Sequence, residues 1–291
     1  MPAGNRENFG RHINCLRREA GASALKFFMN TILANYKNWH GVIVGAGGTI
    51  SNFVPHLSQL MYSLKNEHMS FVLADEDIVE PGNVGRQFFA DFDVGNNKAR
   101  TLQLRYQNTW NVELSYYPHY IREEKMLEKL LLPPMFQKRK QVMPILIGGV
   151  DNHYSRRIMD RVFRRAKNLV YLDSGNGKYT GQVVVAMRYN GKTLLKPPSD
   201  YFPEILTEQD NISAGGTCGR ETVKNPQTLI ANLWAATTLL SLLYNIVSLK
   251  QMPIALTTFN SANCLSKPVY CHPSVGAKKR EKEVYYDAKK I

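Results

Sequence analysis

Three glycines placed directly after a short apolar run are the first residues whose spacing could support chemistry. Gly45, Gly47 and Gly48 follow the β-branched run 42–44, which is typical of a strand buried on both faces. Apolar residues then recur at helical spacing over 53–64. A strand, a glycine-rich turn and a helix suit phosphate binding, because glycines let the backbone approach a phosphate and the helix start offers free N–H donors. The same pattern also fits a tight turn that binds no ligand.

Carboxylates follow two further predicted strands. Asp75 ends the apolar segment 69–74 and is placed to accept hydrogen bonds from ribose hydroxyls. Asp151 follows the buried segment 144–147 and could bridge Mg2+ to a phosphate through a carboxylate oxygen. In a parallel sheet the carboxyl ends of the strands lie at one edge, where ligands bind. We therefore expect both acids beside the glycine turn.

Two cations, Arg86 and Lys98, lie between these acids in the sequence. Near a nucleotide they would suit a polyphosphate rather than a nicotinamide ring. Their charge would offset the negative charge that builds on the phosphates as a bond to the α-phosphorus forms. The alternative is that both are solvated surface cations.

The elements that must position these residues alternate between strand and helix along the chain. This alternation predicts an α/β fold with a doubly wound, mostly parallel, Rossmann-like sheet. The predicted organisation is an N-terminal arm and helix over 1–39, a nucleotide-binding domain over 40–260 and a basic tail over 261–291. Within the domain, 190–224 reads as a long crossover loop without a clear element. A buried C-terminal helix follows it.

Composition narrows the class of protein. The 291 residues carry a net charge of +13, with 44% hydrophobic and 21% charged residues, which are globular values. The excess charge is local, as at Arg156-Arg157, and is predicted to form a solvated basic face. The sequence contains no helix-turn-helix or zinc-finger pattern that would indicate binding to nucleic acid. The predicted helix within 229–249 carries no charged residue and is long enough to span a bilayer. Asn232 and Asn245 interrupt its apolar sequence, so a buried helix is the better interpretation.

Cysteine usage and the N-terminal sequence bear on the compartment. The four cysteines form no C-x-x-C pair, which gives no support to a zinc site and fits a reducing compartment. The first residues have no apolar signal core. We therefore expect a cytoplasmic protein.

Taken together, the spaced motifs resemble the ThiF/MoeB/ubiquitin-activating-enzyme superfamily over about residues 41–250. They are Gly-x-Gly-Gly-Thr-x-Ser at 45–51, Asp-x-Asp-x-Val-Glu-x-x-Asn-x-x-Arg-Gln at 75–87, Asp-x-Gly-x-x-Lys at 93–98 and Asp-Asn at 151–152. A finer similarity is to the ThiF-like protein of the PRTRC cassette of bacterial plasmids and mobile elements. It rests on Asp-Ser-Gly-Asn-Gly at 173–177 and Thr-Gly-Gln-Val-Val at 180–184.

The resemblance implies a reaction: with ATP and Mg2+, members adenylate the C-terminal glycine carboxylate of a ubiquitin-like protein and release pyrophosphate. It also implies roles for residues of this chain. These are the phosphate turn for Gly45, Gly47 and Gly48, ribose binding for Asp75, phosphate contacts for Asn83, Arg86 and Lys98, loop support for Gln87, and Mg2+ and the reacting carboxylate for Asp151. It further suggests a homodimer whose partner arm supplies an arginine. The candidates are Arg6, Arg11, Arg17 and Arg18.

Three points leave alternatives open. Ile50 stands where the family has a glycine, so the start of the helix must accommodate a larger side chain. The zinc-binding cysteine pairs of many relatives are absent. Cys218, in the crossover loop, is either a thioester or acyl-disulfide nucleophile or an ordinary thiol. The competing hypotheses are a non-catalytic ThiF-like scaffold in a plasmid-associated assembly and, less favoured, an NAD-dependent oxidoreductase.

Overall fold

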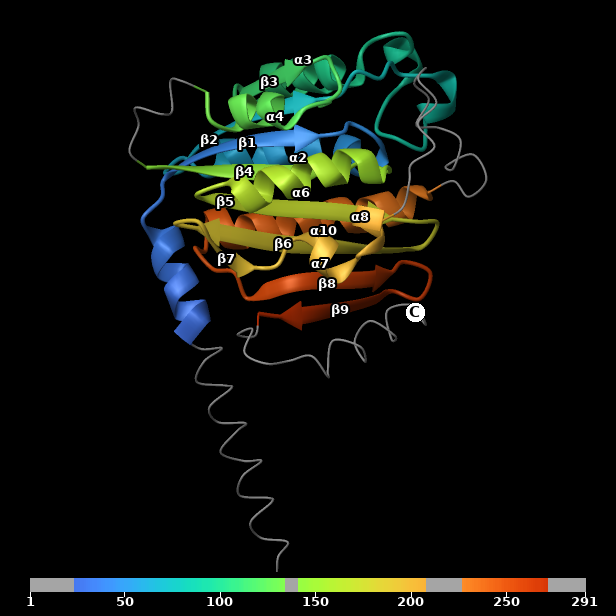
Figure 1. Ribbon diagram of the computed structural model, residues 1–291. Coiled ribbons are helices and arrows are strands. Elements are labelled where there is room, and N and C mark those ends of the chain that lie inside the picture. Colours follow the sequence, from blue (N-terminus) through green and yellow to red (C-terminus); the bar gives the residue numbers. More distant parts are fainter. Residues whose placement is uncertain (1–23, 134–140, 208–226, 272–291) are drawn as a thin grey trace, which may run out of the picture.

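The computed structural model describes residues 24–133, 141–207 and 227–271 (Figure 1). Within these residues the strands form one nine-stranded sheet in the order β3-β2-β1-β4-β5-β6-β8-β9, with β7 paired to β6. The strands are β1 (Asn38–Val44), β2 (His68–Ala74), β3 (Glu113–Tyr117), β4 (Val142–Gly148), β5 (Leu169–Asn176), β6 (Thr180–Tyr189), β7 (Lys192–Leu195), β8 (Ile254–Asn260) and β9 (Leu265–Tyr270). Strands β1 to β5 pair in parallel, and the remaining pairings are antiparallel.

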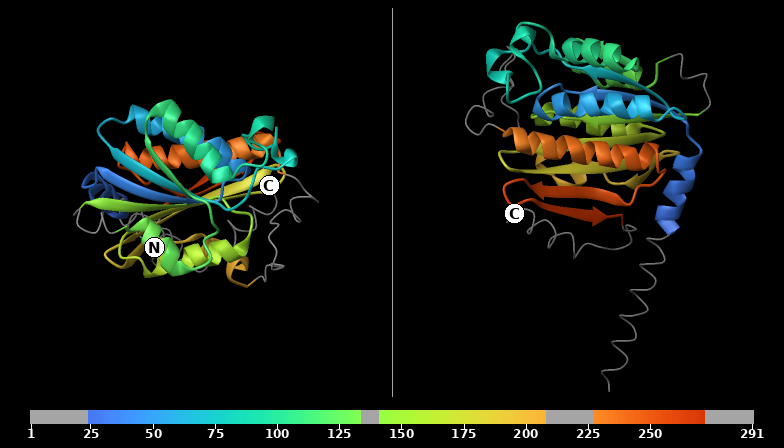
Figure 2. Two further views of the ribbon diagram at one scale, coloured as in Figure 1. Left: turned by 90° about the horizontal axis from the view of Figure 1, so that it is seen from above. Right: turned by 180° about the vertical axis from the view of Figure 1, so that it is seen from behind.

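Helices cover both faces of the sheet (Figure 2). The longer ones are α2 (Gly48–Ser63), α3 (Lys98–Trp110), α4 (Glu124–Leu131), α6 (His153–Arg165) and α10 (Leu229–Val247). Shorter ones are η1 (Pro81–Asn83), η2 (Asp91–Asp93), α7 (Pro198–Tyr201) and α8 (Glu204–Thr207), and a further helix spans Ala24–Ala34. Helices α2, α3 and α10 lie on one face, and α4 and α6 lie on the other.

Alternation along β1 shows why two layers form. Trp39 and Ile43 belong to the apolar cluster under α2 and α10, whereas Val42 and Val44 belong to the cluster under α4 and α6. Successive strand residues point to opposite faces, so an uninterrupted apolar strand must be covered twice. The sheet is therefore the central layer between two sets of helices, as the sequence predicts.

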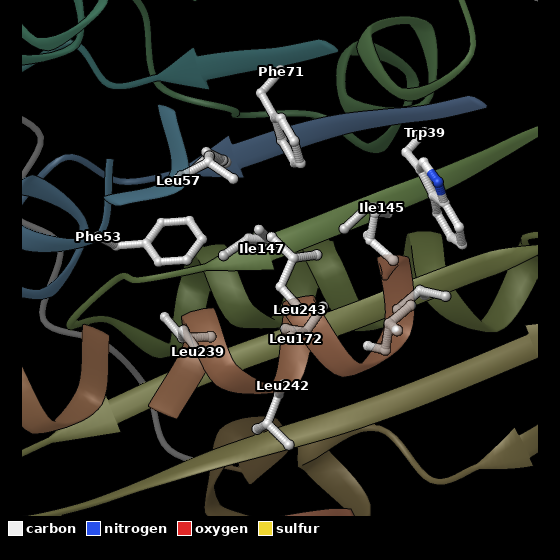
Figure 3. Close-up of a cluster of buried hydrophobic side chains, with 14 of the residues drawn as sticks. Trp39, Phe53, Leu57, Phe71, Ile145, Ile147, Leu172, Leu239, Leu242 and Leu243 are labelled. Atoms are coloured by element: carbon white, nitrogen blue, oxygen red, sulfur yellow. The ribbon is translucent and has the colours of Figure 1, made fainter. Parts of the chain in front are cut away.

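Helix α10 is long and apolar enough to cross a membrane by length and composition alone, but half of the apolar stretch is buried inside the protein. Leu239, Leu242 and Leu243 pack with sheet residues and with Phe53 of α2 (Figure 3). This packing confirms the predicted buried C-terminal helix. The apolar side chains of α10 therefore contribute to the hydrophobic core of the protein.

Two segments differ from their predicted form. The crossover segment, expected to lack elements, begins with β7, α7 and α8, while 208–226 lies outside the described residues. The predicted tail contains β9, which pairs antiparallel with β8 at one edge of the sheet. The elements β7, α7 and α8 are four residues long each, and β9 is largely exposed, so neither segment has an apolar periodicity from which a strand or helix could be predicted.

Candidate functional site

The strands β1, β2 and β4 are parallel neighbours, so their carboxyl ends lie side by side at the same end of the sheet. The N–H of Gly45 donates to the Ala74 carbonyl at 2.9 Å, and the N–H of Gly149 donates to the Val44 carbonyl at 3.0 Å. Gly45 has φ of +97°, and a Cβ there would lie 2.7 Å from the Gly149 carbonyl oxygen. Only glycine fits this position without strain. The glycine turn therefore touches the strand end that leads to Asp151.

Asp75 fastens the glycine turn. It is buried, and its carboxylate accepts the Ala46 N–H at 2.5 Å and the Asp77 N–H at 2.8 Å. Burial, and then the negative charge of Asp77, raise the pKa of Asp75 to about 7. Both carboxylate oxygens retain lone pairs for a further donor. Asp75 thus lies where the sequence predicts, and it also holds the turn in place.

Lys98, the first residue of α3, is buried, which excludes the interpretation that it is a solvated surface cation. Its ammonium lies 3.2 Å from Asp77 Oδ2, and the Tyr120 hydroxyl donates to the same carboxylate. Sequence reasoning did not identify Tyr120 or this use of Asp77. A single tyrosine in a loop gives no signal of its own.

A cavity of about 340 Å³ opens beside Tyr120, the residue whose hydroxyl donates to Asp77. It is lined by Glu76, Tyr117, His119, Tyr120, Arg122, Glu123 and Met126. The Arg122 guanidinium pairs with Glu76 at 3.2 Å at its rim. The cavity thus combines aromatic walls with exposed charges next to Asp77.

The loop that carries Arg86 is held by Asn83. The buried Asn83 side chain accepts the Glu80 N–H at 3.0 Å, and its backbone carbonyl accepts the N–H of Gln87 at 2.8 Å. Phe88 N–H donates to Ser51 Oγ at 3.0 Å, which ties the loop to α2. Across the described part of the chain, the half-buried Arg86 guanidinium has no acidic partner. Arg86 is therefore available to an anionic ligand, while Asn83 shapes the loop.

Asp151 is exposed, just before α6, and a buried ion pair supports the turn behind it. Arg156 Nε lies 3.0 Å from Asp173 Oδ2, and Arg156 Nη2 donates to the carbonyls of Val150 at 2.6 Å and Ser174 at 3.1 Å. Burial raises the pKa of Asp173, and the charge of Arg156 opposes that shift. The prediction that Arg156 belongs to a solvated basic face is wrong. Its position one turn after Asn152, which caps α6, is the sequence signal that could have identified it.

Ile50 is fully buried, and its side chain packs against the end of β4. A Cβ on Gly149 would lie 2.3 Å from Ile50 Cγ1, so a glycine there makes room for the larger side chain. The remaining predicted residues, Cys218 and the arm arginines 6, 11, 17 and 18, lie outside the described residues.

The described residues of the site suit a metal ion that is carried on phosphates. Among the described residues, no group of three or more His, Cys, Asp or Glu side chains could hold a metal. Mg2+ is commonly bound through one or two carboxylates together with substrate phosphates and waters. An exposed Asp151 that follows the strand end touching the glycine turn fits that mode.

Comparison with known proteins identifies the family. The ThiF family model matches residues 21–275. The chain belongs to the ThiF family. It is 30% identical over 154 residues to the SUMO-activating enzyme subunit uba-2 of Caenorhabditis elegans, an alignment that covers 52% of this chain and 23% of that protein. The chain thus spans about a quarter of the curated relative that it matches.

Solved structures share the fold at low sequence identity. MccB of E. coli with ATP matches with a TM-score of 0.56 at 16% identity, covering 84% of this chain and 67% of that chain. MccB with MccA gives a TM-score of 0.59 with the same coverage. PaaA gives 0.56 at 16% identity, covering 94% and 75%. These likenesses confirm the Rossmann-like, mostly parallel architecture.

Proposed function

We propose that this protein is an ATP-dependent adenylyltransferase that activates the C-terminal glycine carboxylate of a small ubiquitin-like protein and releases pyrophosphate. The observation that carries the proposal is the convergence, at one sheet edge, of a glycine turn, Asp75, Arg86 and Asp151. Membership of the ThiF family supports it, as do the names of similar proteins, which include a SUMO-activating subunit and MccB structures with ATP and with MccA.

The proposed reaction needs positioning and charge neutralisation more than proton transfer. A carboxylate oxygen of the partner attacks the α-phosphorus, a new P–O bond forms, and the bond to the leaving pyrophosphate breaks. The carboxylate is already ionised, so no general base is required. Arg86 would stabilise the charge that develops on the phosphates. Lys98 would contribute its charge while holding Asp77 in place.

The nucleotide is proposed to lie along the strand ends. Its phosphates would face Gly45, Gly47 and Gly48 at the start of α2, and its ribose would donate to Asp75. The base would enter the cavity beside Asp77, whose walls include Tyr117 and Tyr120. Asp151 would hold Mg2+ that is carried on the phosphates, and Gln87 would support the loop that carries Arg86. Asn83, for which the resemblance implies a phosphate contact, is buried and accepts the Glu80 N–H, so we propose that it holds this loop instead.

Further features of the proposal concern the assembly. We propose a cytoplasmic homodimer of the PRTRC type, with an arginine of the partner's arm completing the site. Cys218 remains a candidate nucleophile for a step after adenylation, and neither nucleic acid nor a membrane is required. The scaffold hypothesis drew its support from Ile50. The absence of a side chain at Gly149 leaves space for Ile50 at the end of β4, which weakens that support.

Pyrophosphate exchange into ATP tests the proposal, in the presence of small proteins that end in a flexible, glycine-terminated tail. We expect Arg86→Ala to reduce exchange by about a hundredfold, the typical effect of losing one preorganised charge contact. Asp151→Ala should abolish exchange. Arg100→Ala is the matched control, because Arg100 is exposed on α3, and its exchange should stay within about twofold of wild type.

Two results would count against the proposal. Near-wild-type exchange in both Arg86→Ala and Asp151→Ala would remove the proposed mechanism. Tight binding of NAD without binding of ATP would instead favour the oxidoreductase hypothesis.

A further inference from the structure

Helix α10 carries one buried polar side chain at the end nearest the candidate site. Asn232 is 1% exposed in a helix that is otherwise largely apolar. We infer that Asn232 is a positioning residue that holds the Arg86 loop against the start of α2, an inference that rests on the proposed function. Nothing in its amino-acid type alone assigns it this role.

The Asn232 side chain belongs to a chain of polar contacts that joins α2, β5, α10 and the Arg86 loop. Thr49 Oγ1 of α2 donates to Asn176 Oδ1 at 3.0 Å, and Asn176 Nδ2 of β5 donates to Asn232 Oδ1 at 2.8 Å. Asn232 Nδ2 in turn faces the Arg86 carbonyl at 3.5 Å, a long hydrogen bond. Every link runs in the same direction, so a flipped Asn232 amide would place donor against donor and acceptor against acceptor. This polarity fixes the orientation of the amide.

Close packing keeps α10 and α2 together at the same point. A Cβ on Gly48 would lie 2.2 Å from Asn232 Nδ2, so the glycine turn and the amide are in direct contact. The absence of a side chain at Gly48 therefore allows α10 to pack closely against α2, in addition to the proposed close approach of a phosphate. A shift of Asn232 would move the first turn of α2 and the backbone of Arg86 together.

The start of α10 is itself fixed from outside the helix. Thr228 caps it by accepting the Ala231 N–H at 3.2 Å, and the Thr228 hydroxyl donates to the Lys178 carbonyl at 2.7 Å. Gln227 Nε2 donates to the Asn176 carbonyl at 2.9 Å. These bonds leave Asn232 little freedom, so its amide can hold Arg86 at a defined distance from the glycine turn. The cation is then preorganised before a nucleotide arrives.

A double-mutant cycle on pyrophosphate exchange tests the inference. We expect Asn232→Ala to lower kcat at least tenfold while the KM for ATP stays within twofold. If Asn232 acts through Arg86, the variant with both Asn232→Ala and Arg86→Ala should lose no more activity than Arg86→Ala alone. Losses that multiply in the double variant would overturn the inference. Asn245→Ala, at the other end of α10, is the matched control and should retain the wild-type kcat.

A second measurement does not depend on activity. Without the Asn232 amide the Arg86 loop should open more often, so trypsin should cleave after Arg86 at least fivefold faster in Asn232→Ala than in Asn245→Ala. If the wild-type protein catalyses no exchange, the proposed function fails while this measurement still decides the positioning role. Equal cleavage rates in the two variants would overturn it.

Asn232→Asp preserves size but removes the donor to the Arg86 carbonyl, and it replaces Asn232→Ala if that variant does not fold. We expect the same fall in kcat and the same faster cleavage. Failure of both variants to fold would also overturn the inference, because Asn232 would then be required for the core rather than for positioning Arg86.

Discussion

Asp75 combines two backbone hydrogen bonds with a raised pKa, and this combination should couple ATP binding to pH. Its pKa is about 7 because burial and Asp77 both disfavour the charged form. Ribose hydroxyls that donate to Asp75 would favour that charged form and lower the pKa on binding. Binding then releases a proton, and affinity rises with pH until the free-state pKa is passed.

The expected result is that ATP binds about tenfold more tightly at pH 8 than at pH 6, the ratio that follows from a free-state pKa near 7. Isothermal titration calorimetry at several pH values would measure it. The matched ligand is 2′,3′-dideoxy-ATP, which carries the same phosphates but no ribose hydroxyls. Any pH dependence of the phosphates is common to both ligands, so equal profiles would exclude Asp75 as the ribose acceptor.

The sequence predicts the same role for Arg86 and Lys98, namely a cation beside phosphates, but their burial and partners differ in the structure. Lys98 is buried and paired with Asp77, whereas Arg86 is half-buried. We expect Lys98→Met to lower the free energy of unfolding by about 2 kcal/mol, because Asp77 loses its partner beside Asp75. Arg86→Met should change it by less than about 0.5 kcal/mol. Urea unfolding of both variants measures the difference, and equal midpoints would contradict a structural role for Lys98.

At the scale of elements, the start of α2 depends on a matched pair, Ile50 and Gly149. A Cβ on Gly149 would lie 2.3 Å from Ile50 Cγ1, so Gly149→Ala should destabilise the protein by about 1–3 kcal/mol through overpacking. Ile50→Ala should cost about 2–5 kcal/mol by leaving a cavity. The double variant should be more stable than the sum of both losses by at least about 1 kcal/mol, because the clash and the cavity offset each other. Additive losses in thermal unfolding would show that the two residues do not share this space.

The elements differ in how far the sequence predicts them. The apolar strands β1, β4 and β5 were predictable because both of their faces are buried, which requires continuous apolar runs. Strand β9 contains Lys267 and Pro268 and is largely exposed, so its pattern does not indicate a strand. The same limit applies within the site. Motif spacing located Asp75 and Asp151, but the contacts of Arg156 and Asn232 join segments far apart in sequence and needed the fold to become visible.

For the whole molecule, one polar cluster contributes to stability at the end of the sheet opposite the candidate site. The candidate site occupies the edge where β1 and β2 end. At the opposite edge, where they begin, Lys250 Nζ donates to Glu67 Oε2 at 2.7 Å and to the Tyr36 carbonyl at 2.9 Å. It also lies 4.7 Å from the centre of the Trp39 ring, whose Nε1 donates to the same Glu67 oxygen at 2.7 Å. This cluster joins the segment after α10 to the starts of β1 and β2.

Because this cluster lies at the end of the strands opposite the candidate site, its loss should change stability without changing catalysis. We expect Lys250→Met to lower the free energy of unfolding by about 2 kcal/mol, since Glu67 and Trp39 lose a charged partner that is largely shielded from water. The variant should keep the wild-type rate of pyrophosphate exchange and the wild-type affinity for ATP. Lys65→Met is the matched control, because Lys65 is exposed close to Glu67, and its stability should stay within about 0.5 kcal/mol of wild type. Urea unfolding measures the stability of both variants, and pyrophosphate exchange measures their activity. A Lys250→Met variant that unfolds at the same midpoint as Lys65→Met, or one that loses exchange while folded, would show that the two edges are not independent.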